Sequence, residues 1–179
     1  MVIDGKIARL KSVEVSDALF ISKIRNNPAI NSYLSSQKEI SLAEQSNWIM
    51  KNSEFKSHYF IISNKKTNEK VGTISIYNID EMKGKAEFGR YICLNPIMAI
   101  EAVLMLIRFG FQKLELNEIY CRTDLRNLKV WNQHYNFGFE DAGFEKVAKN
   151  NTTLKIQTLK KNNYMRFDYS KLDYTISKF

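Results

Sequence analysis

The stretch that decides the fold is Tyr91-Ile92-Cys93-Leu94-Asn95-Pro96, in which an apolar strand runs directly into the start of a helix. Asparagine is a favoured N-cap residue and proline is favoured at the first helical position, so the pair Asn95-Pro96 predicts a helix that begins at Pro96. Apolar residues then recur at helical spacing, at Ala99, Val103, Ile107 and Phe111. The N–H groups of a first helical turn lack helical acceptors and lie at the positive end of the helix dipole, so this junction is able to bind a phosphate group.

Three strands are expected before this junction. Residues 58–62 and 71–77 are rich in β-branched and aromatic side chains, and the polar segment 64–68 between them predicts a hairpin. A third strand is expected over residues 86–93. Alternation predicts that Ala86, Phe88, Arg90 and Ile92 share one face of it, and that Glu87, Gly89, Tyr91 and Cys93 share the other.

The first fifty residues predict one strand and three helices. The strand covers Ile7 to Val15, and Asp17 is a candidate N-cap for a helix over residues 18–25. A second short helix is expected from Ala29 to Leu34. Ser41-Leu42-Ala43-Glu44 matches the capping box and predicts a third helix that ends near Lys51.

Beyond the central helix, the pattern predicts a strand over Asn117 to Thr123, a helix over Arg126 to Tyr135, and strands over Phe139 to Ala148 and Tyr164 to Tyr169. This order predicts an α/β (α+β) fold, with a mixed sheet of about seven strands and helices on both faces. No linker-like segment or internal repeat interrupts the chain, so residues 1–179 are expected to form a single domain.

Composition narrows the function classes. The chain carries 27 basic and 19 acidic residues, a net charge of +8, which favours anionic ligands. No RNA-binding or zinc-finger motif accompanies this charge, which argues against nucleic acid, and Cys93 and Cys121 do not have metal-ligand spacing. No apolar run is long enough to cross a membrane, and the charged segment Met1 to Leu10 is unlike a signal peptide. We therefore expect a cytoplasmic protein without a metal.

A later motif adds a family resemblance. Asn127, Val130, Gly138 and Phe139 fit the pattern N-x-x-(A/V)…G-F, and with the strand and helix order they make nearly the whole chain resemble the GNAT acetyltransferase superfamily. Residues 25–31 resemble the branch that contains ribosomal-protein and nucleotide-amino-sugar (pseudaminic-acid pathway) N-acetyltransferases. The resemblance implies a GNAT fold and direct transfer of an acetyl group from acetyl-CoA, the co-substrate, to a primary amine, with a nucleotide-linked amino sugar as the expected acceptor.

The resemblance also implies that acetyl-CoA lies in a wedge where the family's fourth and fifth strands splay apart, which here are the strands expected over residues 86–93 and 117–123. Ile92, Cys93 and Leu94 would bind the pantetheine by their backbone, and Asn127 would contact the cofactor from the following helix. The pyrophosphate would face Ile97, Met98, Ala99 and Ile100. The glycines of the family's loop are missing here, so the pyrophosphate sits differently, or binds less tightly, or the chain is a non-catalytic GNAT-like binding module.

Three residues are candidates for proton transfer. The family's general-acid tyrosine corresponds to His134, with Tyr135 as its neighbour, and an imidazole can relay protons at neutral pH. Glu87 is the candidate base for the amine. Each also has an ordinary structural interpretation: His134 as a packed histidine near a helix end, and Glu87 as a member of an ion pair.

The sequence specifies the residues that bind the acceptor amine less closely than those that bind the cofactor. Arg25, Asn26 and Asn31 could contact a phosphorylated acceptor, although capping and surface salt bridges explain them nearly as well. Trp48 could stack on a sugar or base, or pack in the core. Protein N-terminal acetylation remains an alternative activity, and the acceptor amine, the acyl group and a homodimeric state are left open.

Overall fold

The computed structural model describes residues 1–31, 33, 38–52, 57–148 and 151–179. These residues form one eight-stranded sheet in the order β1-β2-β3-β4-β5-β6-β8-β7. The strands are β1 (Val2–Asp4), β2 (Ala8–Ser12), β3 (His58–Asn64), β4 (Lys70–Asp80), β5 (Lys85–Cys93), β6 (Glu118–Asp124), β7 (Glu140–Val147) and β8 (Thr152–Lys160). Neighbouring strands are antiparallel except β5 and β6, which are parallel. The expected mixed sheet is confirmed, with one strand more than predicted.

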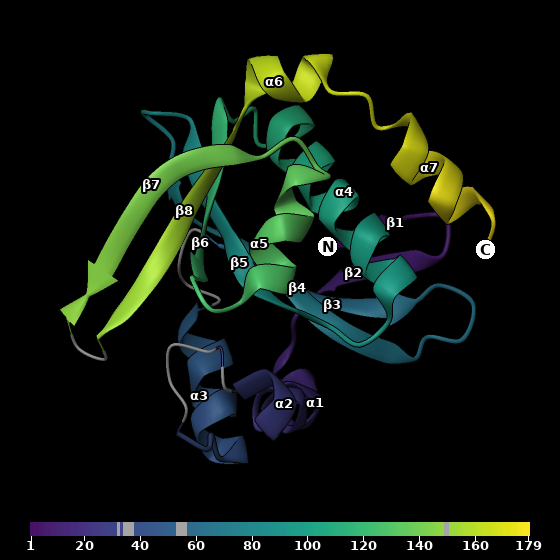
Figure 1. Cartoon of the computed structure of the whole chain (residues 1–179). Coiled ribbons are helices and arrows are strands. Elements are labelled where there is room, and N and C mark those ends of the chain that lie inside the picture. Colours follow the sequence, from purple (N-terminus) through teal and green to yellow (C-terminus); the bar gives the residue numbers. More distant parts are fainter. Residues whose placement is uncertain (32, 34–37, 53–56, 149–150) are drawn as a thin grey trace.

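Helices lie on both faces of this sheet (Figure 1). They are the 3₁₀ turn η1 (Val15–Asp17) and the α-helices α1 (Ala18–Arg25), α2 (Pro28–Asn31), α3 (Leu42–Asn52), α4 (Pro96–Gln112), α5 (Leu128–Tyr135), α6 (Lys161–Arg166) and α7 (Ser170–Ser177). In Figure 1, α4 and α5 cover one face, and α1, α2 and α3 gather on the other side. Among the residues described, no helix is both long enough and apolar enough to span a bilayer.

The main core lies between α4 and the sheet. Phe60 and Ile62 of β3 are fully buried on that side, whereas Ile61 packs with Ala18 and Ile49 on the opposite side. Successive residues of a strand point to opposite faces, so β3 is covered on both, as its unbroken apolar run indicates.

Two predicted caps are confirmed by their hydrogen bonds. The side-chain oxygen of Asn95 accepts from the N–H groups of Ile97 and Met98, at 3.1 and 3.0 Å, and Pro96 is the first residue of α4. At α3, Ser41 N–H donates to Glu44 at 2.8 Å, and Glu44 N–H donates to Ser41 Oγ at 3.2 Å.

Asp17 is the N-cap residue of α1, as predicted, but its side chain does not form the cap hydrogen bond that was expected. Asp17 has helical backbone angles and makes no side-chain cap of α1. Its carboxylate instead accepts from the N–H of Glu14, at 2.8 Å, and from Lys70 Nζ, at 2.6 Å. The acidic residue therefore caps the short turn η1, which precedes α1 and which the sequence pattern did not reveal.

The C-terminal region departs most from the sequence prediction. The strand expected over Tyr164 to Tyr169 is wrong, because residues 161–166 form α6 and Tyr164 stacks on Phe111 of α4, with ring centroids 4.6 Å apart. The last strand is β8, inserted between the parallel-running β6 and β7. Its buried polar residues, Lys155 and Gln157, hid its strand character.

Three smaller differences remain: two short elements that were not predicted, and one helix that ends earlier than expected. β1 and α7 were not predicted. β1 is a three-residue strand that pairs with the adjacent β2, and α7 packs against the main core through Ile176. The helix expected from Ala29 to Leu34 is α2, which ends at Asn31. Residues 32 and 34 lie outside the described residues.

One buried carboxylate ties the N-terminal segment to the central helix. Glu101 of α4 is 5% exposed and accepts hydrogen bonds from the backbone N–H groups of Lys6, Ile7 and Ala8, the last two at 2.9 and 2.6 Å. These donors lie in and beside the turn between β1 and β2, where no strand partner serves Lys6 or Ile7. Glu101 thus supplies the acceptors for the backbone N–H groups of this turn.

We predict that Glu101→Gln destabilises the fold by about 2–4 kcal/mol, because an amide puts an NH₂ group against N–H donors in a buried site. Urea unfolding followed by circular dichroism measures this change. Glu140→Gln, on exposed β7, is the matched control and should shift the free energy of unfolding by less than about 0.5 kcal/mol. Equal effects of the two substitutions would contradict the role of Glu101.

Candidate functional site

The centre of the site is a fork between the two parallel strands. β5 and β6 pair only from Lys85 with Glu118 to Phe88 with Cys121, and beyond these residues the two strands pair no further. The fork lies at the start of α4, as the strand-to-helix junction predicted. Ile97 and Met98 do not fill the opening: neither lines the cavity there, and Met98 packs in the main core.

A bulge in β5 accompanies the fork. In the pairing with β4, Thr73 lies opposite Ile92 but Ser75 lies opposite Gly89, so β5 has one residue more than its partner. Arg90 adopts a left-handed conformation with φ of 49°, which costs a non-glycine residue about 1–2 kcal/mol. Gly72 permits close approach, since a Cβ there would lie 2.1 Å from the carbonyl oxygen of Ile92.

The bulge overturns the predicted faces of this strand. Arg90 lies on the same side as Glu87, and both line one cavity, whereas Tyr91 packs against Phe88, with ring centroids 5.7 Å apart. An extra residue reverses the alternation of every side chain beyond it. The prediction that Arg90 shares a face with Phe88 is therefore wrong.

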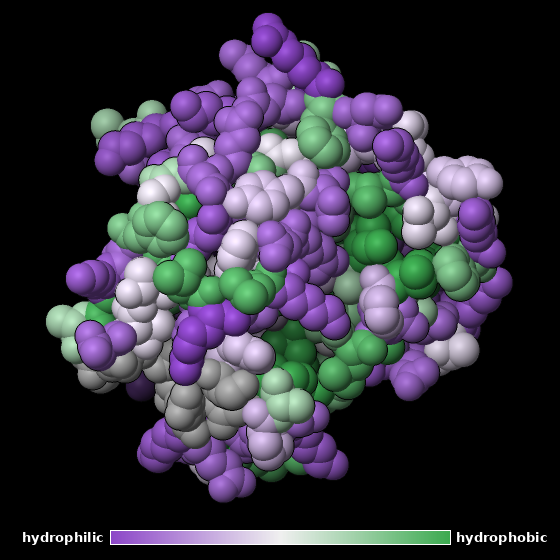
Figure 2. Space-filling view, in the orientation of Figure 1, coloured by the Kyte–Doolittle hydropathy of each residue, from purple (hydrophilic) through white to green (hydrophobic). Residues whose placement is uncertain are grey.

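The fork opens into a cavity of about 740 Å³, which we call the wedge cavity. In Figure 2 hydrophobic surface is visible in a hollow beside the lower end of α5. The wall combines the end of β5, the first turns of α4, and residues of α2 and α5. It is formed by Ala29, Ile30, Tyr33, Tyr91, Ile92, Cys93, Leu94, Pro96, Ala99, Ile100, Asn127, Lys129, Val130, Asn132, Gln133 and Asn136.

Six of the eight predicted cofactor residues line the wedge cavity. They are Ile92, Cys93, Leu94, Ala99, Ile100 and Asn127, whereas Ile97 and Met98 do not. The side chain of Asn127 also caps α5, accepting from Val130 N–H at 3.4 Å. The prediction thus brought together residues from two helices and a strand.

The first turn of α4 has no free N–H group for a phosphate. Pro96 lacks an N–H, Ile97 and Met98 donate to the Asn95 side chain, and Ala99 donates to the Asn95 carbonyl at 2.9 Å. The N–H groups that were expected to face the pyrophosphate are thus already used by the cap that starts the helix. Lys129 of α5 lines the wedge cavity and makes no ion pair with any described residue.

A second cavity of about 380 Å³ adjoins the first, and we call it the polar cavity. Tyr33 and Ile92 line both cavities. The remaining wall residues come from β3, β4, β5, β6, β8 and their surroundings: Arg25, Tyr59, Thr73, Tyr77, Glu87, Arg90, Arg122, Asp124, Val147, Thr152 and Leu154. The two cavities therefore share a boundary at Tyr33 and Ile92.

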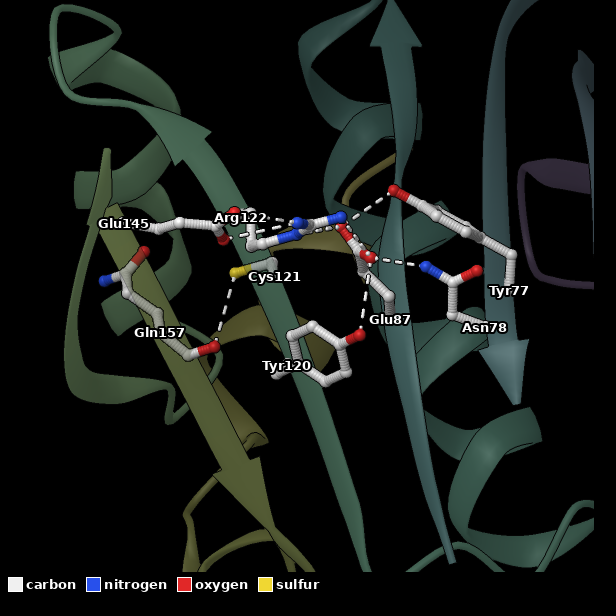
Figure 3. A network of polar contacts seen from close by, with 8 residues as sticks. All are labelled: Tyr77, Asn78, Glu87, Tyr120, Cys121, Arg122, Glu145 and Gln157. Carbon is white, nitrogen blue, oxygen red and sulfur yellow. Dashed lines mark hydrogen bonds and ion pairs between the residues drawn. The ribbon is translucent and has the colours of Figure 1, made fainter. Parts of the chain in front are cut away.

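Glu87 is 2% exposed and lies at the last paired positions of the fork. Figure 3 shows its carboxylate between Arg122 of β6 and two residues of β4. Arg122 donates to both of its oxygens at 3.0 Å, and Tyr77 and Asn78 each donate at 2.9 Å. Burial and the Glu87 charge raise the pKa of Tyr77, so its hydroxyl stays protonated. The carboxylate thus ties β5 to β6 and β4, with both oxygens already accepting.

His134 and Tyr135, the other predicted proton-transfer residues, line neither cavity. His134 is 2% exposed, packs against Phe88 and Phe139, and lies with Nδ1 2.9 Å from Gln157 Oε1. Tyr135 points elsewhere and donates to Asp141 Oδ1 at 2.7 Å. Of the three candidates only Glu87 lies in a cavity wall.

The predicted acceptor residues separate in the same way. Arg25, the last residue of α1, lines the polar cavity. The Asn26 side chain braces the backbone of Ile40, donating at 2.9 Å and accepting at 3.0 Å. Trp48 is not among the residues that line the polar cavity; its ring lies against the Arg90 guanidinium, 4.7 Å from ring centroid to Cζ. Asn31 ends α2, and its side chain lies outside what the structure describes.

The sequence prediction missed several wall residues, among them Tyr33, Tyr77, Arg122 and Lys129. Lys129 follows Asn127 by two residues and could have been noticed as a cation beside the family motif. Tyr77 and Arg122 carry no local signal, because their place in the wall depends on the order of strands in the sheet.

Comparison with known proteins agrees with this geometry. The family model described as acetyltransferase (GNAT) domain matches residues 8–140. An uncharacterized N-acetyltransferase, p20, of Bacillus licheniformis is 28% identical over 125 residues, which cover 66% of this chain and 70% of that protein.

Two solved structures share the fold. FdhC, a nucleotide-linked sugar GNAT in its apo form, has a TM-score of 0.79 and 23% identity, and the match covers 98% of this chain and 97% of that one. The spermidine N-acetyltransferase of Vibrio cholerae, in complex with CoA and spermine, has a TM-score of 0.78 and 20% identity, over 90% of this chain and 99% of that one. At these identities the likeness concerns the fold.

We predict that the buried His134 makes the protein less stable as the pH falls. Burial lowers the pKa of His134 to about 4, although Gln157 opposes the shift, whereas an unfolded histidine titrates near 6.5. Between these values the unfolded chain binds more protons, so the free energy of unfolding falls by roughly 3 kcal/mol from this residue as the pH drops through the window.

Because the chain has two histidines, NMR titration of the imidazole signals can follow each one, with His58 as the internal comparison. Urea unfolding at several pH values, with wild type and His134→Asn side by side, measures the linked stability. A His134 signal that titrates above pH 6 in the folded protein would refute this prediction.

Proposed function

The chain belongs to the GNAT acetyltransferase family of acetyl-CoA-dependent acyltransferases, and on this premise we propose that it acetylates the primary amine of a nucleotide-linked amino sugar. The observation that carries the proposal is the pair of adjoining cavities at the fork between β5 and β6. One is larger, mainly apolar and lined by six of the predicted cofactor residues, and the other is smaller, polar and basic.

The charge of the polar cavity favours an anionic acceptor. Its wall includes three arginines, Arg25, Arg90 and Arg122, and the aromatic rings of Tyr59 and Tyr77. A polyamine, which is a cation, would be repelled by this wall, whereas a nucleotide-linked sugar brings phosphates and rings. The match to a nucleotide-linked sugar GNAT over 98% of this chain supports the same acceptor class.

The wedge cavity suits the pantetheine of acetyl-CoA. Ile92, Cys93 and Leu94 offer a strand edge released from β6 by the fork, and Ala99 and Ile100 offer apolar surface from α4. Since the N–H groups of the first α4 turn are used by Asn95, we propose that Lys129 supplies the charge for the phosphates.

Bound acetyl-CoA supplies an activated acetyl group as a thioester. The amine nitrogen attacks the thioester carbonyl, the C–S bond breaks, and the amine loses a proton while the departing sulfur gains one. The protein holds the two groups at the boundary of the cavities, and such orientation alone supplies a large part of an acyl-transfer rate. Glu87, with both oxygens already accepting, holds Arg122 and Tyr77 in the wall.

Tyr33 is our candidate for the proton donor to the departing sulfur. Among the described wall residues, it alone brings a hydroxyl to both cavities, and it is 43% exposed. A phenol hydroxyl is a proton donor at neutral pH and can act as a general acid. We therefore propose Tyr33, in place of His134 or Tyr135, as the general acid.

The proposed activity is tested by release of CoA thiol from acetyl-CoA with a panel of UDP- and dTDP-linked amino sugars. Spermidine and a peptide with a free N-terminus serve as the competing acceptors. We expect at least one nucleotide-linked amino sugar to be acetylated with kcat/KM at least tenfold above both competitors. A preference for either competitor would overturn the acceptor class.

We predict that Lys129→Ala raises the Kd for CoA about threefold to tenfold, and that the loss shrinks at high salt, because an exposed ammonium contributes a modest, screened attraction to phosphate. Isothermal titration calorimetry at low and high salt measures both. Lys66→Ala, in the exposed turn between β3 and β4, removes one positive charge far from the cavity and should leave the Kd unchanged.

For Tyr33 the matched comparison is a second tyrosine. Tyr33→Phe should lower kcat by about 10²-fold and leave the Kd for CoA unchanged, because a general acid contributes at least that much to rate. Tyr135→Phe, which removes a hydroxyl bound to Asp141 away from both cavities, should keep wild-type kcat. If Tyr135→Phe lowers kcat and Tyr33→Phe does not, the proton donor is Tyr135 of α5 and the proposal for Tyr33 is wrong.

A further inference from the structure

Arg25 and Arg90 carry charge in the polar cavity that no described carboxylate balances. The cavity wall holds two carboxylates, and both are already paired. Glu87 binds Arg122, and Asp124 binds Arg126 through two contacts, at 2.7 and 3.0 Å. Neither Arg25 nor Arg90 forms an ion pair with a described residue. Two positive charges therefore remain in the wall.

Both guanidinium groups also hold buried nitrogens that have no hydrogen-bond partner in the part of the chain that the structure describes. These are Nε of Arg25 and one terminal nitrogen, Nη1, of Arg90. Burial lowers the pKa of Arg90, and the neighbouring charge of Arg25 adds to this effect. A buried N–H without an acceptor is costly, and two like charges at one site add to that cost, so such groups are expected to have a partner in the working protein.

Aromatic rings hold Arg90 without using its N–H groups. Its guanidinium lies 4.1 Å from the ring centroid of Tyr77, 4.7 Å from that of Trp48 and 5.9 Å from that of Tyr59. Rings contact the face of a guanidinium, whereas its N–H donors point outward in the plane, in a fork that matches an oxyanion. The left-handed backbone of Arg90 and the bulge in β5 bring this group to the cavity side.

We propose that Arg25 and Arg90 together bind an oxyanion of the acceptor, a phosphate or a carboxylate, and so orient the acceptor amine toward the wedge cavity. This inference rests on the proposed function and deepens it, because it assigns the recognition of the acceptor to two residues. Trp48 is a positioning residue that acts through Arg90 and does not touch the acceptor. The two positive charges match one phosphate dianion or the two charges of a diphosphate.

Trp48 supplies a binding signal that does not depend on catalysis. The chain has two tryptophans, and Trp131→Phe leaves Trp48, stacked on Arg90, as the sole emitter. In this background, with CoA present in excess to fill the wedge cavity, UDP, inorganic pyrophosphate and succinate are titrated in turn. A saturable change in Trp48 emission with UDP or pyrophosphate identifies a phosphate site. A change in emission with succinate alone identifies a carboxylate site.

We expect Arg25→Gln and Arg90→Asn each to weaken binding of the active probe roughly ten- to hundredfold, because each removes a charged hydrogen-bond donor. Asparagine tolerates the left-handed conformation of residue 90, so Arg90→Asn keeps the bulge while removing the charge. Arg9→Gln, at the exposed pair with Asp4, is the matched control and should bind as wild type. Circular dichroism melting confirms that the variants fold.

The outcomes separate this inference from the proposed function. If a nucleotide-linked amino sugar is acetylated but its KM is unchanged in Arg25→Gln and Arg90→Asn, the oxyanion site is wrong while the activity stands. If no such sugar is acetylated but UDP binds in an Arg90-dependent way, the site stands and the acceptor class is wrong. If no probe alters Trp48 emission in the folded Trp131→Phe protein, the oxyanion site is overturned.

Discussion

The structure depends on the point at which β5 and β6 stop pairing. A parallel pair that continued to the ends of both strands would leave no space beside α4. Here the pairing ends at Phe88 and Cys121, and a bulge at Arg90 turns the rest of β5 toward β4. Gly72 is needed opposite the bulge, because a Cβ there would collide with the Ile92 carbonyl. One extra residue thus opens the wedge cavity and also delivers an arginine to the polar cavity.

Electrostatics then divides the charged side chains of the site into two groups. The Glu87–Arg122 and Asp124–Arg126 pairs satisfy each other and maintain the geometry of the fork. Arg25 and Arg90 are left without such partners among the described residues, and aromatic rings fix the plane of Arg90. Paired charges in a wall mostly preserve its shape, whereas unpaired charges favour a ligand of opposite sign. This division explains why Glu87, the most buried acid of the site, is better suited to structure than to proton transfer.

The start of α4 illustrates how one residue can serve folding at the expense of a predicted binding role. Asn95 and Pro96 leave no unsatisfied N–H group in the first turn, which stabilises the helix. The same hydrogen bonds remove the donors that a pyrophosphate would use. The helix start therefore lacks both the family's glycines and free N–H groups, and this absence of donors is the reason for proposing Lys129 of α5, which lines the wedge cavity, as the cation for the phosphates.

Local patterns in the sequence determined the α4 cap, the capping box at Ser41 and the hairpin of β3 and β4, because each depends on neighbours within a few positions. The family motif also picked out six residues that line the wedge cavity. Only the tertiary structure decided the rest. The bulge reverses the faces of β5 without changing its composition, β8 inserts between β6 and β7, and α6 forms where Tyr164 meets Phe111. His134 lies in the core and Arg90 in a cavity wall for the same reason. Whether a polar side chain reaches a cavity or the core is set by the packing of distant strands, and no short stretch of sequence contains that information.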